Sequence, residues 1–254
     1  DQEHAGDRER STSVNGDGNL AVFCDFENVA LGVRDANLTK FDIRPVIERL
    51  LLKGSIVAKK AYCDWDRYKE FKATMHEAAF ELIEIPHARQ SGKNSADIRM
   101  VVDALDLCYT KEHIDTFVII SGDSDFSPLV SKLRENAKSV IGVGVKNSTS
   151  DLLVNNCDEF IFYDDLVAER KSPRRRQRGK GREKSAVTTP KDQPAPAPAP
   201  DDPAQEAIDL VLQTAEAIYA ERGDRAKLWG SMVKQTLKRR RPGFNESAYG
   251  FRSF

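Results

Sequence analysis

Short apolar runs alternate with amphipathic stretches along residues 19–166. An apolar run bounded by polar residues predicts a buried strand, whereas apolar residues recurring at three and four positions predict a helix. Strands that are each separated by a helix indicate a mostly parallel sheet covered on both faces, so we expect an α/β, Rossmann-like domain. The predicted strands are residues 20–24, 55–62, 80–85, 116–120, 139–145 and 160–163, and the predicted helices are residues 43–53, 66–79, 96–109, 127–137 and 150–156.

The pattern changes at both ends of this region. Residues 1–18 are polar, and we expect a disordered tail there. Residues 167–204 read as a linker, because nine basic residues and one acid fill positions 170–184 and an alternating Pro-Ala run follows. Residues 205–254 predict a small helical module, with helices at 205–219 and 226–238.

The formal net charge of −1 hides an asymmetry, since residues 19–166 are acidic and the segments after them are basic. This distribution suits a protein that binds a polyanion through flexible basic segments, although an acidic globule with a solvated tail is the simpler alternative. The four cysteines form no CxxC pair, which argues against structural zinc and for reduced core residues. With no long apolar run and no signal peptide, we expect a cytoplasmic protein without membrane contact.

Acidic residues follow several of the predicted strands. Asp25 ends the first strand, Asp64 follows the second, and Asp123 and Asp125 follow the strand at 116–120. In a parallel sheet these strand ends meet at one edge, and Asp97 in the first turn of a helix can reach the same edge. Each acid alone could be a turn former or a helix cap, but together they predict a site.

Carboxylates brought together repel one another and raise each other's pKa unless a cation compensates. Oxygen ligands of this kind favour Mg²⁺ or Mn²⁺ over zinc, and such ions can activate water against a phosphodiester. Asp103, further along the same predicted helix, competes with Asp97 for the third acidic position. The four histidines offer no competing catalytic group, since they are scattered over a tail, a helix, a loop and a turn.

At these residues the chain resembles the NYN family of PIN-like nucleases, and within it the LabA-like branch. The resemblance covers about residues 19–166. It rests on Ala21-Val22-Phe23-Cys24-Asp25-Phe26-Glu27-Asn28, Ala61-Tyr62-Cys63-Asp64-Trp65, the helix holding Asp97 and Asp103, and Ser121-Gly122-Asp123-Ser124-Asp125-Phe126.

The resemblance implies a Mg²⁺- or Mn²⁺-dependent ribonuclease with a PIN-like fold. It implies that Asp25, Asp97 and Asp123 bind metal, with Asp125 as a fourth ligand or a residue that orients water. It also implies that Asn28 and Ser121 support contacts to the metal or to phosphate, although Asn28 could equally be a turn cap. Asp64 and Asp103 would be accessory acids.

RNA is the expected partner, in single-stranded or loop regions. Arg89, Lys93 and Lys146 would meet phosphates, and Trp65 would stack on a base unless it belongs to the core. Residues 205–254 resemble the start of an OST-HTH/LOTUS domain, an RNA-binding module, on the segments 207–218, 228–234 and 242–251.

Two other functions stay open at this point. An RNA-binding scaffold with a non-catalytic acidic pocket would carry the same residues. A receiver-like or phosphatase-like domain also places acids at strand ends, but the DxDxT pattern is absent and the strand at 80–85 ends without an Asp. The RNA target, endo- or exonucleolytic mode and homo-oligomerisation are left undetermined.

Overall fold

The computed structural model describes residues 18–38, 40–85, 95–171, 203–223, 227–242, 244 and 249. The chain divides into two compact units, Asp1–Val167 and Ala168–Phe254. Arg89 and Lys93, the predicted tail except Gly18, and most of the predicted linker lie outside the described residues.

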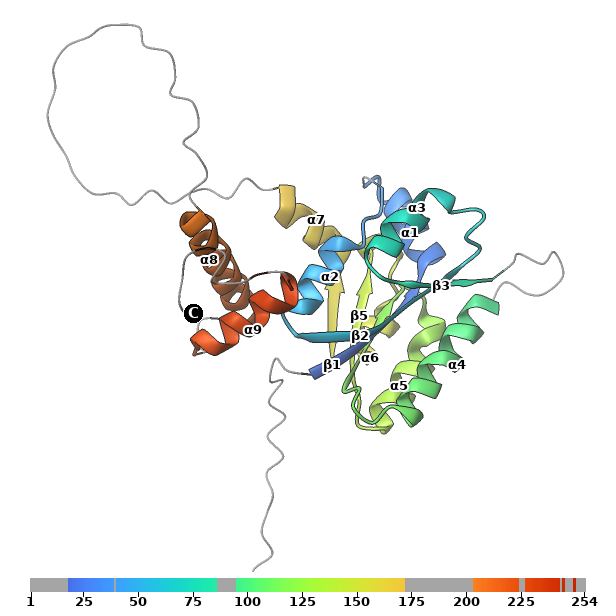
Figure 1. Cartoon of the computed structure of the whole chain (residues 1–254). Coiled ribbons are helices and arrows are strands. Elements are labelled where there is room, and N and C mark those ends of the chain that lie inside the picture. Colours follow the sequence, from blue (N-terminus) through green and yellow to red (C-terminus); the bar gives the residue numbers. More distant parts are fainter. Residues whose placement is uncertain are drawn as a thin grey trace, which may run out of the picture. The chain divides into compact units, whose positions relative to one another are not determined.

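The first unit is built on a six-stranded parallel sheet with strand order β3-β2-β1-β4-β5-β6 (Figure 1). The order runs outward in both directions from β1 and β4, so the sheet has its topological switch point between these two strands. The predicted α/β fold class is confirmed. The strands are β1 Gly18–Asp25, β2 Gly54–Cys63, β3 Glu81–Glu84, β4 Thr116–Ile120, β5 Ser139–Gly144 and β6 Glu159–Phe162.

Helices cover both faces of the sheet (Figure 1). One hydrophobic cluster unites β1 with α1, α2, α3 and α7, and a second unites it with α4, α5 and α6. Alternate residues of β1 enter opposite clusters, as side chains of a strand must. The helices are α1 Phe26–Asp35, α2 Arg44–Leu51, α3 Lys69–Glu77, α4 Ser95–Thr110, α5 Ser127–Glu135, α6 Asp151–Asn156 and α7 Tyr163–Lys171, with single turns η1 Ser124–Phe126 and η2 Lys146–Ser148.

The helix α1 was not predicted, because Gly32 and the two valines, Val29 and Val33, weaken the helical propensity of its sequence. It forms directly after β1, with Asp25 as its N-cap. Burial of Val29 and Val33 in the first cluster then stabilises it. Gly32 has a packing reason, since an added Cβ would lie 2.3 Å from Ser148 Oγ. The helix α7, likewise unpredicted, begins directly after β6.

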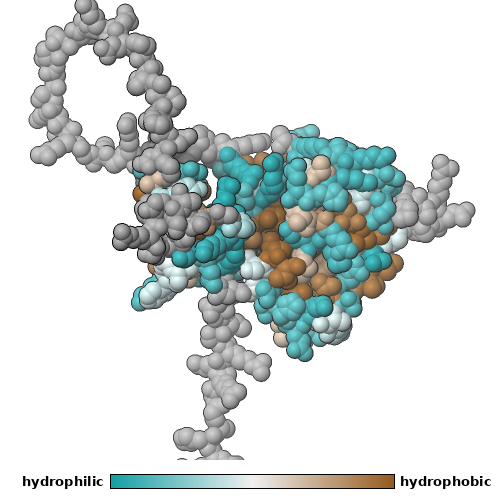
Figure 2. All heavy atoms as spheres, viewed as in Figure 1, coloured by the Kyte–Doolittle hydropathy of each residue, from teal (hydrophilic) through white to brown (hydrophobic). Residues whose placement is uncertain are grey.

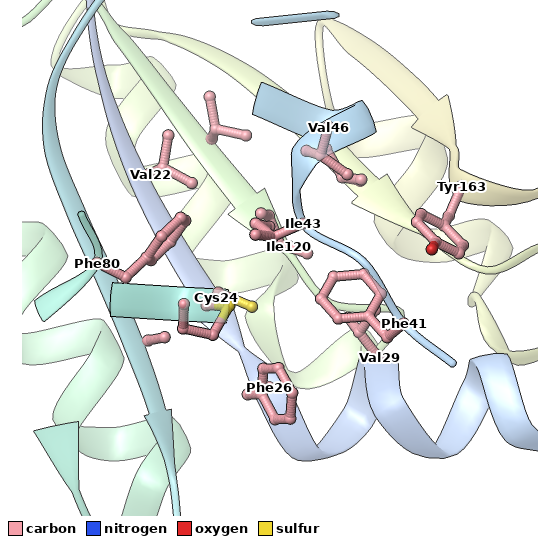
Figure 3. Close-up of a cluster of buried hydrophobic side chains, with 14 of the residues drawn as sticks. Val22, Cys24, Phe26, Val29, Phe41, Ile43, Val46, Phe80, Ile120 and Tyr163 are labelled. Atoms are coloured by element: carbon pink, nitrogen blue, oxygen red, sulfur yellow. The ribbon is translucent and has the colours of Figure 1, made fainter. Parts of the chain in front are cut away.

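Figure 3 shows the first cluster, in which Cys24 and Phe26 are both fully buried. The Phe26 ring packs against Phe41 with centroids 5.7 Å apart and against Trp65 at 4.9 Å. Asp25 lies between these two buried residues in the chain. The core therefore holds the backbone of Asp25 in place from both sides.

The second unit contains α8 Pro203–Arg222 and α9 Gly230–Arg240. These are the two helices predicted near residues 205–219 and 226–238. They pack through Ala207 on α8, Leu237 on α9 and Phe244. In the described parts of both units, no helix has the length and apolar character that crossing a membrane requires.

Candidate functional site

Asp25 is the buried centre of the candidate site. It ends β1 and is only 8% exposed. Its Oδ2 accepts a hydrogen bond from Ser121 Oγ at 3.0 Å, and its Oδ1 accepts one from the backbone N–H of Asn28 at 3.4 Å. The carboxylate is therefore fixed by the first turn of α1 and by the residue that follows β4.

The turn after β4 is hydrogen-bonded to α1. Ser121 Oγ also accepts from the N–H of Asp123 at 3.2 Å, and Asn28 Oδ1 accepts from the N–H of Gly122 at 2.9 Å. Gly122 is required by close packing, because an added Cβ would lie 2.3 Å from the backbone oxygen of Ser148. The observed contact of Asn28 joins α1 to the turn.

The two acids of this turn have different surroundings. Asp123 is half-buried, and its Oδ1 accepts from the N–H of Asp125 at 2.9 Å, so it caps η1. Asp125 is exposed, lies inside η1 and leads into α5. Asp125 does not cap α5, whose N-cap is Phe126 without a side-chain hydrogen bond, and the acid that caps a turn here is Asp123, at η1.

Asp97 and Asp103, the two candidates for the third acidic position, lie in different surroundings. Asp97 lies in the first turn of α4, close enough to Asp25 to raise its pKa. Asp103 lies further along the helix, where its Oδ2 accepts from Tyr62 OH at 2.9 Å and its Oδ1 from Arg99 Nε at 3.0 Å. Tyr62 stands beside Asp25 in the β1–β2 register. Asp103 therefore joins α4 to the strand next to Asp25.

The pKa of Asp25 is raised to about 7, mainly by burial and in addition by the negative charges of Asp97 and Asp123. The hydrogen bonds from Ser121 and Asn28 act in the opposite direction, because they stabilise the carboxylate. The three acids from β1, α4 and the turn after β4 thus share one electrostatic field. Such a field attracts a cation.

The described residues contain no ready-made cluster of three or more His, Cys, Asp or Glu side chains that could hold a metal ion. The donor chemistry nevertheless fits Mg²⁺ or Mn²⁺, because Mg²⁺ is commonly held by one or two carboxylates and completes its shell with water. Asp25 and Asp123 provide hard oxygen ligands on neighbouring strand ends.

At the end of β2, the prediction for Trp65 needs correction. Trp65 is 1% exposed, its indole Nε1 donates to the carbonyl of Ile83 at 3.2 Å, and its ring packs on Phe26. A buried ring offers no face to a base, so the stacking role predicted for Trp65 is wrong and its core alternative holds. Asp64 is half-buried and caps its own turn, accepting from the N–H of Asp66 at 3.1 Å.

Lys146 lies after β5, at the same carboxyl edge of the sheet. Its Nζ pairs with Asp165, and its backbone N–H donates to Asp164 at 2.9 Å. The side chain stays exposed, but part of its charge is already compensated. Of the three basic residues expected to meet RNA, Lys146 is the one that the structure describes.

Sequence reasoning missed two residues that shape the site. Gly122 was read only as part of a motif, although its lack of a side chain lets the turn approach residues 148 and 149. Tyr62 was read as strand and as part of a motif, without a role of its own, although its hydroxyl donates to Asp103. The signal for Tyr62 was its place, one residue before the end of a strand that neighbours β1.

Comparison with known proteins agrees with this architecture. A crystal structure of a Vibrio parahaemolyticus protein of unknown function superposes with a TM-score of 0.53 and 26% identity, covering 60% of this chain and 96% of that one. An uncharacterised protein of Methanocaldococcus jannaschii is 24% identical over 173 residues, which are 68% of this chain and 67% of that protein.

A third relative carries a descriptive name. Meiosis regulator and mRNA stability factor 1 of Xenopus tropicalis is 26% identical over 150 residues, which are 59% of this chain. The matched part spans only 9% of that protein's length. The NYN domain profile matches residues 19–164, more than half of the chain and nearly all of the sheet unit. This chain therefore belongs to the NYN domain family, within the PIN-like nuclease superfamily.

Proposed function

We propose that this protein is a metal-dependent ribonuclease of the LabA-like branch that hydrolyses phosphodiester bonds in single-stranded or loop RNA. The observation that carries the proposal is the buried carboxylate of Asp25, whose pKa is raised by burial and by Asp97 and Asp123. A buried carboxylate that is repelled by two other negative charges lowers the stability of the folded state. Such a cost is typical of functional sites.

In this proposal Asp25, Asp97 and Asp123 hold Mg²⁺ or Mn²⁺. The ion would supply an activated water and stabilise the charge that develops on the phosphodiester. Ser121 and the N–H of Asn28 hold Asp25 in one orientation, and Asn28 holds the turn that carries Asp123. The exposed carboxylate of Asp125 completes the set as a further ligand or as an acceptor that orients water.

The basic second unit would add affinity for RNA. Its resemblance to the beginning of an OST-HTH/LOTUS domain and its basic residues at the end of α9 support this part. The name of the Xenopus relative refers to mRNA stability, which agrees with RNA as the substrate class. Arg89, Lys93 and Lys146 would contribute contacts nearer the acids.

A cleavage assay tests the catalytic proposal. The full chain with Mn²⁺ or Mg²⁺ should shorten a labelled single-stranded RNA, and EDTA should stop it. Asp25→Asn and Asp123→Asn should each lower the rate at least about a hundredfold, since each removes a charge that acts on the reaction. The matched control is Glu112→Gln, an exposed acid just before β4 begins and so at the opposite edge of the sheet from the turn, which should cleave like the wild type. Equal rates in the wild type and both site variants would rule out the assignment.

A non-catalytic RNA-binding scaffold is the second candidate, favoured by the lack of a three-residue metal cluster among the described residues. It predicts RNA binding that weakens with salt and no shortening of RNA in any divalent metal. RNA of constant length over hours, together with measurable binding, would decide for the scaffold.

A further inference from the structure

Helix α4 exposes a stripe of apolar side chains that nothing in the candidate site uses. Ile98 is 63% exposed, Val102 56% and Tyr109 61%, and Leu105 between them is half-buried. The spacing of four, three and four residues is the spacing of a coiled-coil seam, so the four side chains fall on one face of the helix. We call this set the α4 stripe.

The surface view agrees with these exposures. Figure 2 shows brown, hydrophobic spheres among the teal ones on the part of the surface that α4 occupies in Figure 1. Large apolar side chains of a helix are normally turned to the core. Here the opposite side of α4, with Met100, Ala104 and Cys108, is buried in the second cluster. The α4 stripe is therefore a second apolar face on a helix that is already anchored.

We propose that the α4 stripe is a dimer interface, in which α4 packs antiparallel against α4 of a second copy of this chain. A twofold axis between Val102 and Leu105 places Ile98 opposite Tyr109 and Val102 opposite Leu105. Each large side chain then meets one from the other copy. The contact is isologous and closed, as in most homodimers.

The charges beside the stripe select a second copy in the antiparallel direction. Arg99 and Asp106 are both exposed and lie on the same flank of the stripe, about 100° and 80° around the helix from Ile98. In an antiparallel pair this flank meets itself, so Arg99 of each copy comes within about one helical turn of Asp106 of the other. In a parallel pair this flank would meet the opposite flank of the second helix, so Arg99 and Asp106 would not face each other.

The composition of the stripe also favours protein over RNA. Its four members carry no positive charge, whereas nucleic-acid surfaces are basic. Arg99 donates through Nε to Asp103, and its guanidinium has further N–H groups for a second carboxylate. The seam is only about 17 Å long, so the dimer is expected to form at micromolar concentrations rather than to be obligate.

The test is the mass of the full chain in sedimentation velocity from about 1 to 200 μM. The wild type should pass from its monomer mass of 28.4 kDa toward twice that value. Val102→Glu should stay monomeric over the range, because it places a carboxylate in the seam. The matched control is Leu152→Glu on α6, a helical side chain 57% exposed outside the stripe, which should dimerise like the wild type.

A charge exchange tests the antiparallel direction. An Arg99→Glu copy alone and an Asp106→Arg copy alone should each dimerise at least about tenfold more weakly than the wild type, since like charges then face each other. Mixed in equal amounts, they should form a heterodimer, because Glu meets Arg and Asp meets Arg. Circular dichroism of each variant checks folding. A wild type that stays monomeric, a Val102→Glu dimer of wild-type affinity or no recovery on mixing would overturn the proposal.

Discussion

Asp25 combines two roles that conflict in free energy. As the N-cap of α1 it stabilises the helix, and as a buried carboxylate near Asp97 and Asp123 it destabilises the folded state when charged. Ser121 and the N–H of Asn28 reduce that cost without removing it. The residue most central to the site is thus expected to be unfavourable for stability.

Asp25→Asn should therefore stabilise the fold above neutral pH. The pKa of Asp25 is about 7 in the folded state and 3.8 as the ordinary value, so the folded state holds its proton more tightly. As pH rises from about 4 to 7, the free energy of unfolding of the wild type falls relative to that of the variant. The difference is largest above pH 7, where Asp25 is charged in both the folded and the unfolded state. We expect a gain of about 2–4 kcal/mol at pH 8 and almost none at pH 4.

Urea denaturation of both proteins in EDTA at pH 4, 6 and 8 measures this difference. EDTA removes divalent cations, which would otherwise stabilise the charged carboxylate and mask the effect. Glu112→Gln, at the opposite edge of the sheet, serves as the control and should show no such growth of stability with pH. A gain that does not change with pH, or a loss at pH 8, would contradict the raised pKa.

Among the elements, β1 and β4 set the position of the site. They are neighbours at the switch point of the sheet, so Asp25 and the turn at Ser121 lie side by side although 96 positions separate them. Helix α4 adds Asp97 from one face of the sheet, and α1 adds Asn28 from the other. Each element supplies one group, and none forms the site alone.

Gly122→Ala should disturb the turn that joins these elements. The added Cβ would lie 2.3 Å from the backbone oxygen of Ser148, and backbone cannot move aside as a flexible side chain can. We expect a loss of about 2–3 kcal/mol in stability and a fall in any RNA cleavage. The matched control is Gly18→Ala in β1, where the nearest atom would be 3.6 Å away. Urea denaturation measures both, and equal stabilities would contradict the packing argument.

At the scale of the whole molecule, an acidic sheet unit is joined to a basic second unit. Lys238 and Arg241 lie exposed at the end of α9, where positive charge also suits the helix dipole. In this view the second unit captures the phosphates and the sheet unit carries the chemistry.

Replacing both Lys238 and Arg241 by Ala should weaken binding of single-stranded RNA. The affinity falls as salt rises, and each lost phosphate contact makes the slope of log affinity against log salt less steep by about 0.7. Losing both contacts should therefore make the slope less steep by about 1.4. Fluorescence anisotropy between 50 and 300 mM salt measures the slope. The control pair Lys69→Ala and Lys111→Ala, exposed on the sheet unit, should leave it unchanged. An unaltered slope in the α9 variant would remove the second unit from RNA binding.

The sequence by itself determined the six strands, five helices of the sheet unit and both helices of the second unit, because apolar periodicity reports which side of an element is buried. It also pointed to acids at the strand ends. It failed for α1, whose weak propensity is overcome by burial, and for Trp65, whose aromatic ring suits both a core and a base.

Only the tertiary structure decided how these residues meet. The strand order made Asp25 and Ser121 neighbours, and the partners of Asp103 separated it from Asp97. It also left the α4 stripe uncovered. Periodicity acts over a few residues along the chain, whereas contacts, burial and pKa depend on packing between segments that are far apart in it.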